Sequence, residues 1–459
     1  MPNNAIRAIE YMKEITNYAY LENLELSEYV AFPVYIIIIL MISYYIQLRN
    51  VKTNPIYKYY TRGVLVKLLG AVVFCLVYIF YYKGGDTITY YETARALANL
   101  FRVHPDDFMK VVFEAPSPEN YFLFDGRITG FPWPYMYYNP QTFLVTKLVC
   151  PFLILTFNSY MLSTILFSWI SFIGIWKLFK MLSIYLKEDV GKIAFAVLFI
   201  PSVVFWGSGI MKDTITFSAT CWFVYAFHNV LILKKKRVVN IISMIIMGYL
   251  IVAIKPYIMY ALLPGAIIWL FHSKIVKIKS SFIRYSIIPL IYVVGMGGGM
   301  VLLGSISNFN LNSAIFAAVE KQSDLKQGYY KGSSFDIGKT DASINGVLTK
   351  APSALLAGLF RPFVFEAKNV MMILSGIENA IYLYFTIIIL IRLRVKNFFK
   401  LIFNNPIVLF SLSYVILLSF IVGISTSNFG AMVRFKIPYL PFFMAALFIM
   451  DRYSKRKLS

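Results

Sequence analysis

Residues 64–82 read VLVKLLGAVVFCLVYIFYY, a run in which Lys67 is the one charged residue. An apolar run of this length can cross the roughly 30 Å hydrocarbon core of a bilayer as an α-helix. The residues that follow, KGGDTITYYETARALA (83–98), begin with two glycines and then present Asp86. Because paired glycines end helices, we expect a membrane-spanning helix that stops there and a second helix that begins at Asp86.

The whole chain shares this apolar character. Of its 459 residues, 59% are hydrophobic and 14% are charged, and its mean hydropathy is +0.67. A soluble domain carries about 25% charged residues. The composition therefore predicts an all-α, polytopic integral membrane protein.

About eleven apolar runs are long enough to be candidate transmembrane helices. They lie near residues 30–48, 64–82, 161–179, 193–210, 214–233, 238–254, 257–271, 285–304, 370–391, 406–424 and 437–450. Another run, 144–157, is short and contains Lys147 and Pro151, so we interpret it as an interfacial or re-entrant segment.

The basic residues predict the orientation of these helices. If 144–157 does not cross, alternate segments share one side of the membrane: 49–62, 177–192, 234–237, 272–284, 392–400 and 451–459. Together they hold 24 Lys or Arg and three acidic residues, a net charge of +21 out of +22 for the chain. Because basic loops favour the cytoplasmic side, we predict that this side is cytoplasmic. The positive charge then reflects topology and anionic lipid headgroups, and it does not indicate nucleic-acid binding.

This orientation predicts a single multi-pass membrane domain, residues 1–459, in the cell inner (cytoplasmic) membrane. The N-terminus is expected outside and the C-terminus in the cytoplasm. The expected parts are an external N-terminal segment 1–29, large external loops 83–160 and 305–369, and a cytoplasmic tail 451–459. Asp86 then lies on the outer side.

Four helix boundaries on the predicted outer side carry cations. Isolated charges at such boundaries often only anchor helix ends. A set of them on a side with almost no net charge indicates instead a site that binds a phosphate or diphosphate. The candidate phosphate-binding residues are Lys212, Lys255, Arg361 and Arg434, with Asp213, Glu366 and Lys436 as secondary candidates beside them.

Asp86 is expected at the N-cap of the helix that follows the second membrane run. Ala94, Leu97, Ala98 and Phe101 form an apolar stripe on that helix, so we expect it to lie along the membrane surface. Asp86 then has two interpretations, as a capping residue or as a general base at the outer boundary of the membrane. Tyr90 and Glu92, on the same helix, are secondary site candidates.

Two other features allow more than one interpretation. The segment GRITGFPWPYMYYNPQTF (126–143) is typical of an interfacial aromatic belt, and equally of a surface that stacks on sugar rings.

The cysteines all lie in apolar runs and the histidines are scattered, so we predict no cofactor and no metal centre. A divalent cation held by acidic residues near His104 is the alternative; those residues are Glu92, Asp106 and Asp107.

Two short patterns resemble motifs of the GT-C superfamily of membrane glycosyltransferases. One is Gly85-Asp86 followed by Tyr90 and Ala94, on a helix directly after a membrane helix. The other is Arg434-Phe435-Lys436-Ile437-Pro438 with Leu440-Pro441-Phe442, which resembles a segment of the mannosyltransferase-like members. Two further stretches, Trp206-x-Ser208-Gly209-x-x-Lys212-Asp213 and Arg361-Pro362-Phe363…Glu366, resemble bacterial proteins of surface-polysaccharide assembly. The extra helix 30–48 and the lack of a second acidic motif depart from the GT-C pattern.

The resemblance implies transfer of a sugar from a polyprenyl-phosphate or polyprenyl-diphosphate carrier to a hydroxyl of a glycan, lipid or protein acceptor. Asp86 would be the catalytic carboxylate, and the reaction would invert the anomeric centre. The product would belong to cell-envelope or surface glycan assembly. Two alternatives remain, a polymerase of O-antigen or exopolysaccharide repeat units and a transporter or flippase of lipid-linked glycans.

Overall fold

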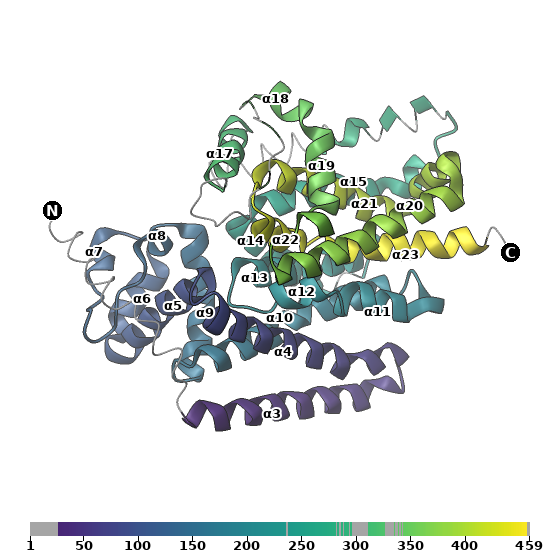
Figure 1. Cartoon of the computed structure of the whole chain (residues 1–459). Helices are drawn as coiled ribbons and strands as arrows, with labels where there is room; N and C mark the ends of the chain where they lie inside the picture. Colours follow the sequence, from purple (N-terminus) through teal and green to yellow (C-terminus); the bar gives the residue numbers. More distant parts are fainter. Residues whose placement is uncertain are drawn as a thin grey trace. The chain divides into compact units, whose positions relative to one another are not determined.

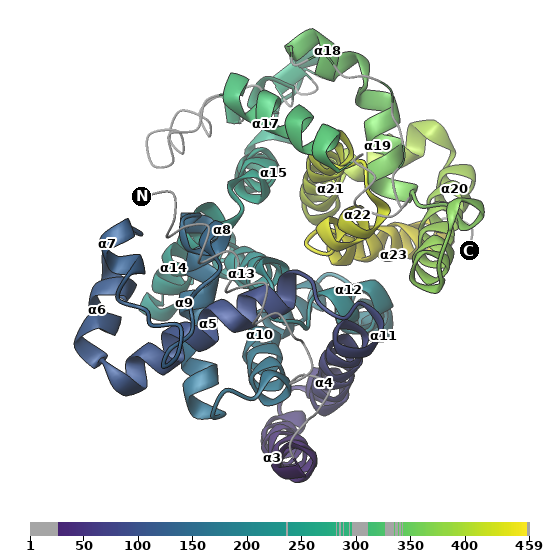
Figure 2. The ribbon, with the colours of Figure 1, turned by 60° about the vertical axis from the view of Figure 1, so that its left-hand side comes forward.

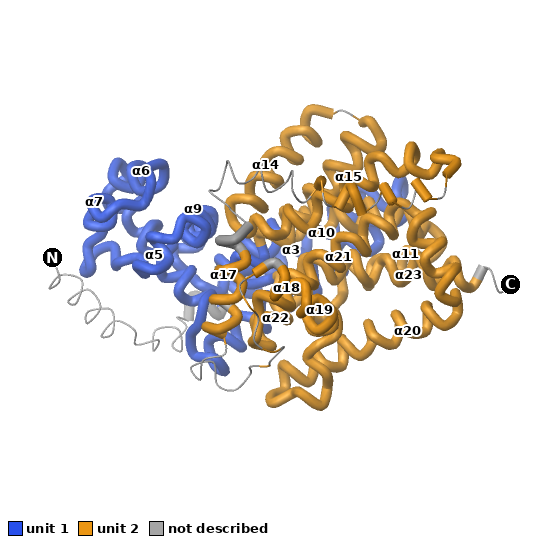
Figure 3. The backbone as a smooth tube through the Cα atoms, turned by 90° about the horizontal axis from the view of Figure 1, so that it is seen from above, with its two compact units in different colours: residues 1–171, 208–214 blue, residues 172–207, 215–459 orange. Residues whose placement is uncertain are grey.

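The computed structural model describes residues 26–235, 237–280, 282–283, 286–287, 289–292, 294–295, 311–325, 335, 338, 341 and 343–456. Across these residues the secondary structure is helical, with no β-strand. The chain forms two compact units, coloured separately in Figure 3. Unit 1 comprises residues 1–171 and 208–214, and unit 2 comprises residues 172–207 and 215–459.

Unit 1 begins with a helical hairpin, in which α3 lies beside α4 (Figure 1). After α4 and a π-helical turn, α5 begins and packs against α9. The elements of unit 1 are α3 (Leu26–Val51), η1 (Pro55–Tyr59), α4 (Tyr60–Leu76), η2 (Val77–Tyr81), α5 (Asp86–Val103), α6 (Pro105–Phe113), α7 (Pro118–Tyr121), α8 (Pro134–Tyr137), α9 (Pro140–Leu155) and the first half of α10 (Tyr160–Leu182).

Unit 2 is built around α21 (Pro406–Ser425), which packs most extensively against α15, α19 and α23. Figure 2 shows α21, α22 and α23 gathered beside α19. Its elements after α10 are η3 (Lys187–Asp189), α11 (Val190–Leu198), α12 (Pro201–Trp206), α13 from Ile215 on (the helix is Lys212–Phe227), η4 (His228–Ile232), α14 (Val238–Ile254), α15 (Pro256–Ile275), α17 (Leu311–Asp324), α18 (Ile344–Thr349), α19 (Ala351–Phe360), η6 (Val364–Glu366), α20 (Val370–Asn404), α22 (Phe429–Lys436) and α23 (Leu440–Arg456).

Small residues allow α19 and α21 to approach closely. A Cβ added to Gly358 on α19 would lie 2.1 Å from the carbonyl oxygen of Ser419, and one added to Gly423 on α21 would lie 2.0 Å from that of Ala354. Any side chain at either glycine would push the helices apart. Close contact through small residues is how helices associate in lipid, where no hydrophobic effect drives them together.

Seven helices of the described residues are long and apolar enough to cross a membrane, or eight if α22 and α23, bent by 62°, form one span. The seven are Val30–Val51, Pro55–Tyr81, Tyr160–Leu182, Lys212–Ile232, Pro256–Ile275, Val370–Asn404 and Pro406–Ser425. Each coincides with a predicted run. The predicted run 238–254 is also a helix, α14, but a shorter one. A multi-pass membrane protein is therefore confirmed, and the expected total of eleven spans stays a prediction.

The predicted single helix over 193–210 was wrong. The structure has two short helices there, α11 and α12, and Phe199 and Ile200 interrupt them. Pro201 explains the break, because proline has no N–H to donate and disfavours helical geometry at the residue before it. Ile200 is accordingly extended, with φ −67° and ψ 120°.

Other predictions concern segments that the structure describes only in part. Most of the predicted span 285–304 and most of the external segment 1–29 lie outside the described residues. The segment 144–157 lies largely within α9, a short apolar helix, and its interfacial placement stays a prediction. The predicted tail 451–459 continues α23 as helix to Arg456.

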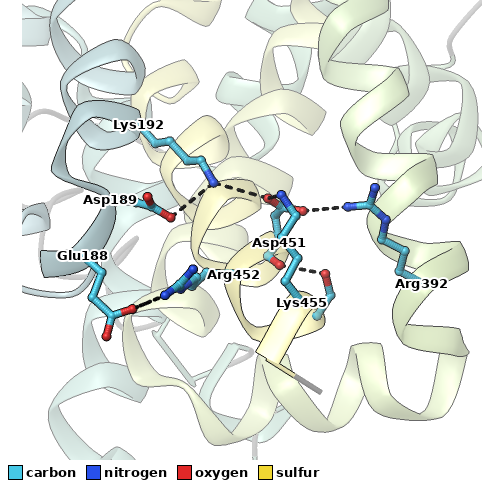
Figure 4. Close-up of polar contacts among 8 residues, drawn as sticks. Glu188, Asp189, Lys192, Arg392, Asp451, Arg452 and Lys455 are labelled. Atoms are coloured by element: carbon cyan, nitrogen blue, oxygen red, sulfur yellow. Dashed lines mark hydrogen bonds and ion pairs between the residues drawn. The ribbon is translucent and has the colours of Figure 1, made fainter. Parts of the chain in front are cut away.

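Ion pairs join three of the segments predicted to be cytoplasmic, all within unit 2 (Figure 4). Asp451 accepts hydrogen bonds from Arg392 Nη1 at 2.9 Å and Lys192 Nζ at 3.5 Å, and it pairs with Lys455 Nζ at 3.1 Å. Glu188 pairs with Arg452 close by. The segments 177–192, 392–400 and 451–459 therefore meet at one end of unit 2, as a shared side of the membrane requires.

Candidate functional site

Asp86 is the first residue of α5, and the N-cap is Gly85, one residue earlier than expected. Gly84 and Gly85 have φ values of 137° and 107°, a region that L-amino acids rarely adopt. Gly85 also lies against Tyr78, whose ring would be 3.1 Å from an added Cβ. This turn leaves Asp86 exposed at the positive end of the helix dipole, where a carboxylate is stabilised.

The rest of α5 is covered by protein over most of its surface. Ala94, Leu97 and Ala98 of the predicted apolar stripe are fully buried, and Phe101 is 39% exposed. Burial extends beyond the stripe to residues on other faces, among them Tyr90. The apolar stripe of α5 is therefore largely covered by protein, where the sequence predicted a face left for lipid.

Two buried tyrosines of unit 1 hold the start of α5. The hydroxyl of Tyr160 and that of Thr87, next to Asp86, are hydrogen-bonded at 3.1 Å. Tyr91 donates to the carbonyl oxygen of Asn158 at 2.7 Å, and its ring meets that of Tyr160 edge-on. These contacts fix the helix that carries Asp86 to the beginning of α10.

Glu92 has a structural partner. Its Oε2 accepts a hydrogen bond from Trp133 Nε1 at 2.6 Å, and the hydroxyl of Thr93 accepts one from the backbone N–H of Trp133 at 3.3 Å. The aromatic segment 126–143 is thus bound to α5. We infer that Glu92 positions this segment.

Other carboxylates of the loop 83–160 have local roles. Asp107 pairs with Lys110 at 2.9 Å, and Asp125 accepts from the N–H groups of Arg127 and Ile128. Glu114 accepts from Asn120 at 2.8 Å. In the described part of the chain, no three His, Cys, Asp or Glu side chains gather as a metal site. The suggested cluster of acids near His104 therefore does not form a metal-binding arrangement in this structure.

Lys212 and Asp213 begin α13, after a loop that lies along the middle of α4 in unit 1. Ser208 donates to the carbonyl oxygen of Lys67 at 3.3 Å. A Cβ added to Gly209 would lie 2.1 Å from the Phe74 ring, so only glycine allows this approach. Asp213 is 1% exposed and Lys67 4%, whereas Lys212 is half-buried. Burying a charged side chain in a membrane-spanning helix costs free energy, and residues that do so usually have a functional role.

Two of the predicted phosphate-binding cations meet at one aromatic ring in unit 2. Lys255 lies in the break between α14 and α15, and its Nζ is 4.6 Å from the centre of the Phe435 ring. The guanidinium carbon of Arg434, on α22, is 5.5 Å from the same centre. Phe435 therefore holds two cations close together although they are far apart in the sequence.

Arg361 has a paired charge. Its Nε donates to both carboxylate oxygens of Glu366 at 2.9 and 3.1 Å, and its guanidinium carbon lies 4.6 Å from the centre of the Phe335 ring. Phe335 stacks on Phe429, which also contacts Arg361. A bidentate pair of this kind neutralises the guanidinium and fixes its plane. The two predicted site residues of the RPFVFE motif thus bind each other.

Lys436 is buried, with 1% of its surface exposed. Its Nζ donates to the carbonyl oxygen of Arg361 at 2.5 Å and to Asn379 Oδ1 at 3.3 Å, and Asn379 in turn donates to the carbonyl oxygen of Pro362. These bonds join α22 to α20 and to the turn after α19. We interpret Lys436 as a residue that positions Arg361 and its own neighbour Phe435.

Three residues of unit 2 form a further group of hydrogen bonds to which the sequence analysis assigned no role: Ser202, Glu378 and Tyr382. Glu378 accepts from the Ser202 N–H at 3.0 Å, from the Ser202 hydroxyl and from Tyr382 at 2.6 Å. Glu378 could have been recognised from the sequence, because it is an acidic residue inside an apolar run. Ser202 and Tyr382 carried no signal, because such residues are common in membrane helices.

Comparison with models of protein families, with curated proteins and with solved structures finds no match for this chain.

Proposed function

We propose that this protein is an integral membrane glycosyltransferase that moves a sugar from a polyprenyl-linked phosphate or diphosphate to an acceptor hydroxyl. The observation that carries the proposal is the convergence of Lys255 and Arg434 on Phe435. Two cations within 5.5 Å of the centre of one ring suit a phosphate or diphosphate group. The predicted orientation places the reaction on the outer face of the membrane, in cell-envelope or surface glycan assembly.

The carboxylate in this proposal is Asp86. It is exposed at the N-terminus of α5. Asp86 would take the proton of the acceptor hydroxyl while that oxygen attacks the anomeric carbon. The bond from the anomeric carbon to the phosphate oxygen breaks in the same step, so the configuration inverts. The lipid phosphate leaves with the bonding electrons, and the resemblance gives the stabilisation of its charge to cationic residues, among them Lys255 and Arg434.

Reconstitution with a labelled polyprenyl-phosphate sugar, or its diphosphate analogue, tests the proposal. Wild-type protein in liposomes should form a glycosylated product, and Asp86→Asn should reduce turnover about 10²–10⁴-fold, the usual contribution of a general base. Asp106→Asn, at an exposed acid of the same loop, is the matched control and should keep full turnover. Normal turnover in Asp86→Asn would remove this residue from the mechanism.

The two cations provide a second arm of the same experiment. Lys255→Gln and Arg434→Gln should each lower turnover of the lipid-linked donor, and the double variant should lose less than the two losses combined, because both contact one leaving group. Lys396→Gln, at an exposed lysine of a predicted cytoplasmic segment, is the control for charge. If a lipid-diphosphate oligosaccharide is used and a single sugar is not, the protein is a polymerase.

A transporter of lipid-linked glycans is the second candidate, and two observations favour it. The broken pair α11 and α12 resembles the discontinuous helices of transporters, and Lys67 and Asp213 are buried inside candidate spans. The liposome assay separates the two functions. Translocation of the intact labelled donor without a glycosylated product would support the transporter.

A further inference from the structure

Three aromatic rings form a stack in unit 1. Phe131 and Tyr138 both lie nearly parallel to Tyr121, with ring centres 5.6 and 5.7 Å from its centre and interplanar angles of 20° and 26°. Tyr121 is 6% exposed, and its hydroxyl donates to the carbonyl oxygen of Pro132 at 2.9 Å. Tyr138, by contrast, is 45% exposed. One ring of the stack is therefore presented to the surroundings.

Packing holds the exposed ring in place. Tyr137, fully buried, meets Tyr138 edge-on with ring centres 5.0 Å apart. The hydroxyl of Tyr137 donates to the carbonyl oxygen of Ser117 at 3.3 Å. A ring fixed in this way loses little conformational entropy when a ligand stacks on it.

A carboxylate lies on the helix that carries the buried ring of the stack, because Glu119 is two residues before Tyr121, which stacks on Tyr138. Glu119, on α7, is exposed, and together with burial its charge raises the pKa of Tyr138. The backbone N–H of Glu119 and the Ser117 hydroxyl lower the pKa of its carboxyl, so it is ionised at neutral pH. Glu114 is a second acid close to α7, because its Oε2 accepts a hydrogen bond from Asn120, the residue after Glu119.

We propose that Tyr138 and Glu119 form a binding site for a neutral glycan, with the sugar ring stacked on Tyr138 and its hydroxyls donating to Glu119. The role of this glycan as acceptor rests on the proposed function. Aromatic faces pack against the C–H faces of sugars, and a carboxylate is a strong acceptor for hydroxyl donors. The site lies in the same unit as Asp86.

The charges favour a glycan over a bilayer surface. Interfacial aromatic belts place Tyr and Trp at the level of lipid headgroups, where anionic lipids attract Lys and Arg. The acids Glu114 and Glu119 would be repelled by such headgroups. A neutral, hydroxyl-rich ligand has no such conflict.

Binding of soluble tetrasaccharides to the full chain in neutral-lipid nanodiscs tests the site. The probes are tetramers of glucose, galactose and N-acetylglucosamine, titrated by saturation-transfer NMR. We expect at least one to bind, Tyr138→Ala to weaken that binding about tenfold, and Tyr138→Phe, which keeps the ring, to bind nearly normally. Glu119→Gln should weaken it severalfold. Phe113→Ala, at a 77% exposed ring of α6, is the matched control and should bind as wild type.

Three results would overturn the proposal: no probe binds, Tyr138→Ala binds as wild type, or Glu119→Gln leaves the glycan affinity unchanged and instead increases binding to anionic vesicles. The last result would identify the segment as a bilayer contact. Glycan binding needs neither the donor nor Asp86, so Asp86→Asn should still bind the probe. A failure of the transfer assay therefore remains distinguishable from a failure of this site.

Discussion

Lys436 Nζ donates a hydrogen bond to the backbone carbonyl oxygen of Arg361, 75 residues earlier in the chain. This bond joins two motifs in the C-terminal half of the chain, which carry four of the ten predicted site residues: Arg361, Glu366, Arg434 and Lys436. Arg361 is paired with Glu366, and Lys255 and Arg434 both contact the ring of Phe435. Among the four residues predicted to bind phosphate, these two are the best candidates in unit 2.

Lys436→Met should destabilise the protein, because two acceptors, the part-buried Arg361 carbonyl and the buried Asn379 Oδ1, lose their donor. An unsatisfied buried acceptor costs about 1–3 kcal/mol, so we expect roughly 2–4 kcal/mol in total and a lower Tm in detergent. All three cysteines are buried, so a thiol-reactive dye reports unfolding. Lys396→Met, at an exposed lysine, is the control. Equal Tm values for the two variants would show that the bonds of Lys436 do not hold this region together.

Asp451→Asn should loosen the ion-pair network of Figure 4. Its side chain is 6% exposed and pairs with three cations whose exposures are 33%, 38% and 53%. Breaking a fully buried pair costs about 3–5 kcal/mol. Partial exposure of the partners lowers this expectation to about 1–3 kcal/mol.

The matched control for Asp451→Asn is Glu188→Gln, whose side chain is 53% exposed. An exposed pair contributes about 0–1 kcal/mol, so this variant should unfold almost as the wild type does. Comparison of the two melting curves at low and high salt completes the measurement. If the Glu188 variant proves the less stable, burial of Asp451 is not what gives the network its strength.

Gly85→Ala should displace the start of α5. The residue has φ 107°, which strains any L side chain, and the new Cβ would lie 3.1 Å from the Tyr78 ring. Such strain costs about 1–3 kcal/mol, and movement of Asp86 should lower turnover together with stability. Gly130→Ala is a matched control, since its φ is 73° but no atom lies within 4 Å of the added Cβ. Full turnover in Gly85→Ala would show that the turn tolerates a side chain.

Cysteine accessibility tests the predicted orientation. The native cysteines are buried, so cysteines introduced at Asp106 and at Lys396, both exposed, can be labelled with little background. An impermeant reagent outside intact cells should label position 106, and position 396 should react only after the membrane is opened. Labelling of both positions from the same side would contradict the positive-inside assignment, and with it the placement of Asp86 outside.

Much of the helical framework could be predicted from apolar runs alone. The predicted run 238–254 has the same bounds as α14, and 406–424 lies within α21. The break at Pro201 was missed because the residues on both sides are apolar enough to continue a run. The N-cap was misplaced by one residue because both Gly85 and Asp86 are good N-cap residues.

The candidate site could be predicted only as a set of residue types. Sequence position indicated that Lys255, Arg361 and Arg434 lie at helix boundaries, but it could not indicate which of them is paired. The Arg361–Glu366 pair spans five residues, whereas the contacts of Lys255 with Phe435 and of Ser202 with Glu378 join distant segments. Contacts between distant segments depend on how the helices pack.

The sequence by itself determined that this chain is a helical membrane protein, where most of its membrane helices run, and that 24 of its 44 basic residues fall in six short segments. Hydrophobic length and charge are local properties, and they act on each segment separately when it meets a bilayer. Only the tertiary structure decided that Glu92 holds Trp133, that Lys436 holds Arg361 and that two cations share the ring of Phe435. Those pairings depend on packing and on the need to satisfy each buried polar group, and both involve residues far apart along the chain.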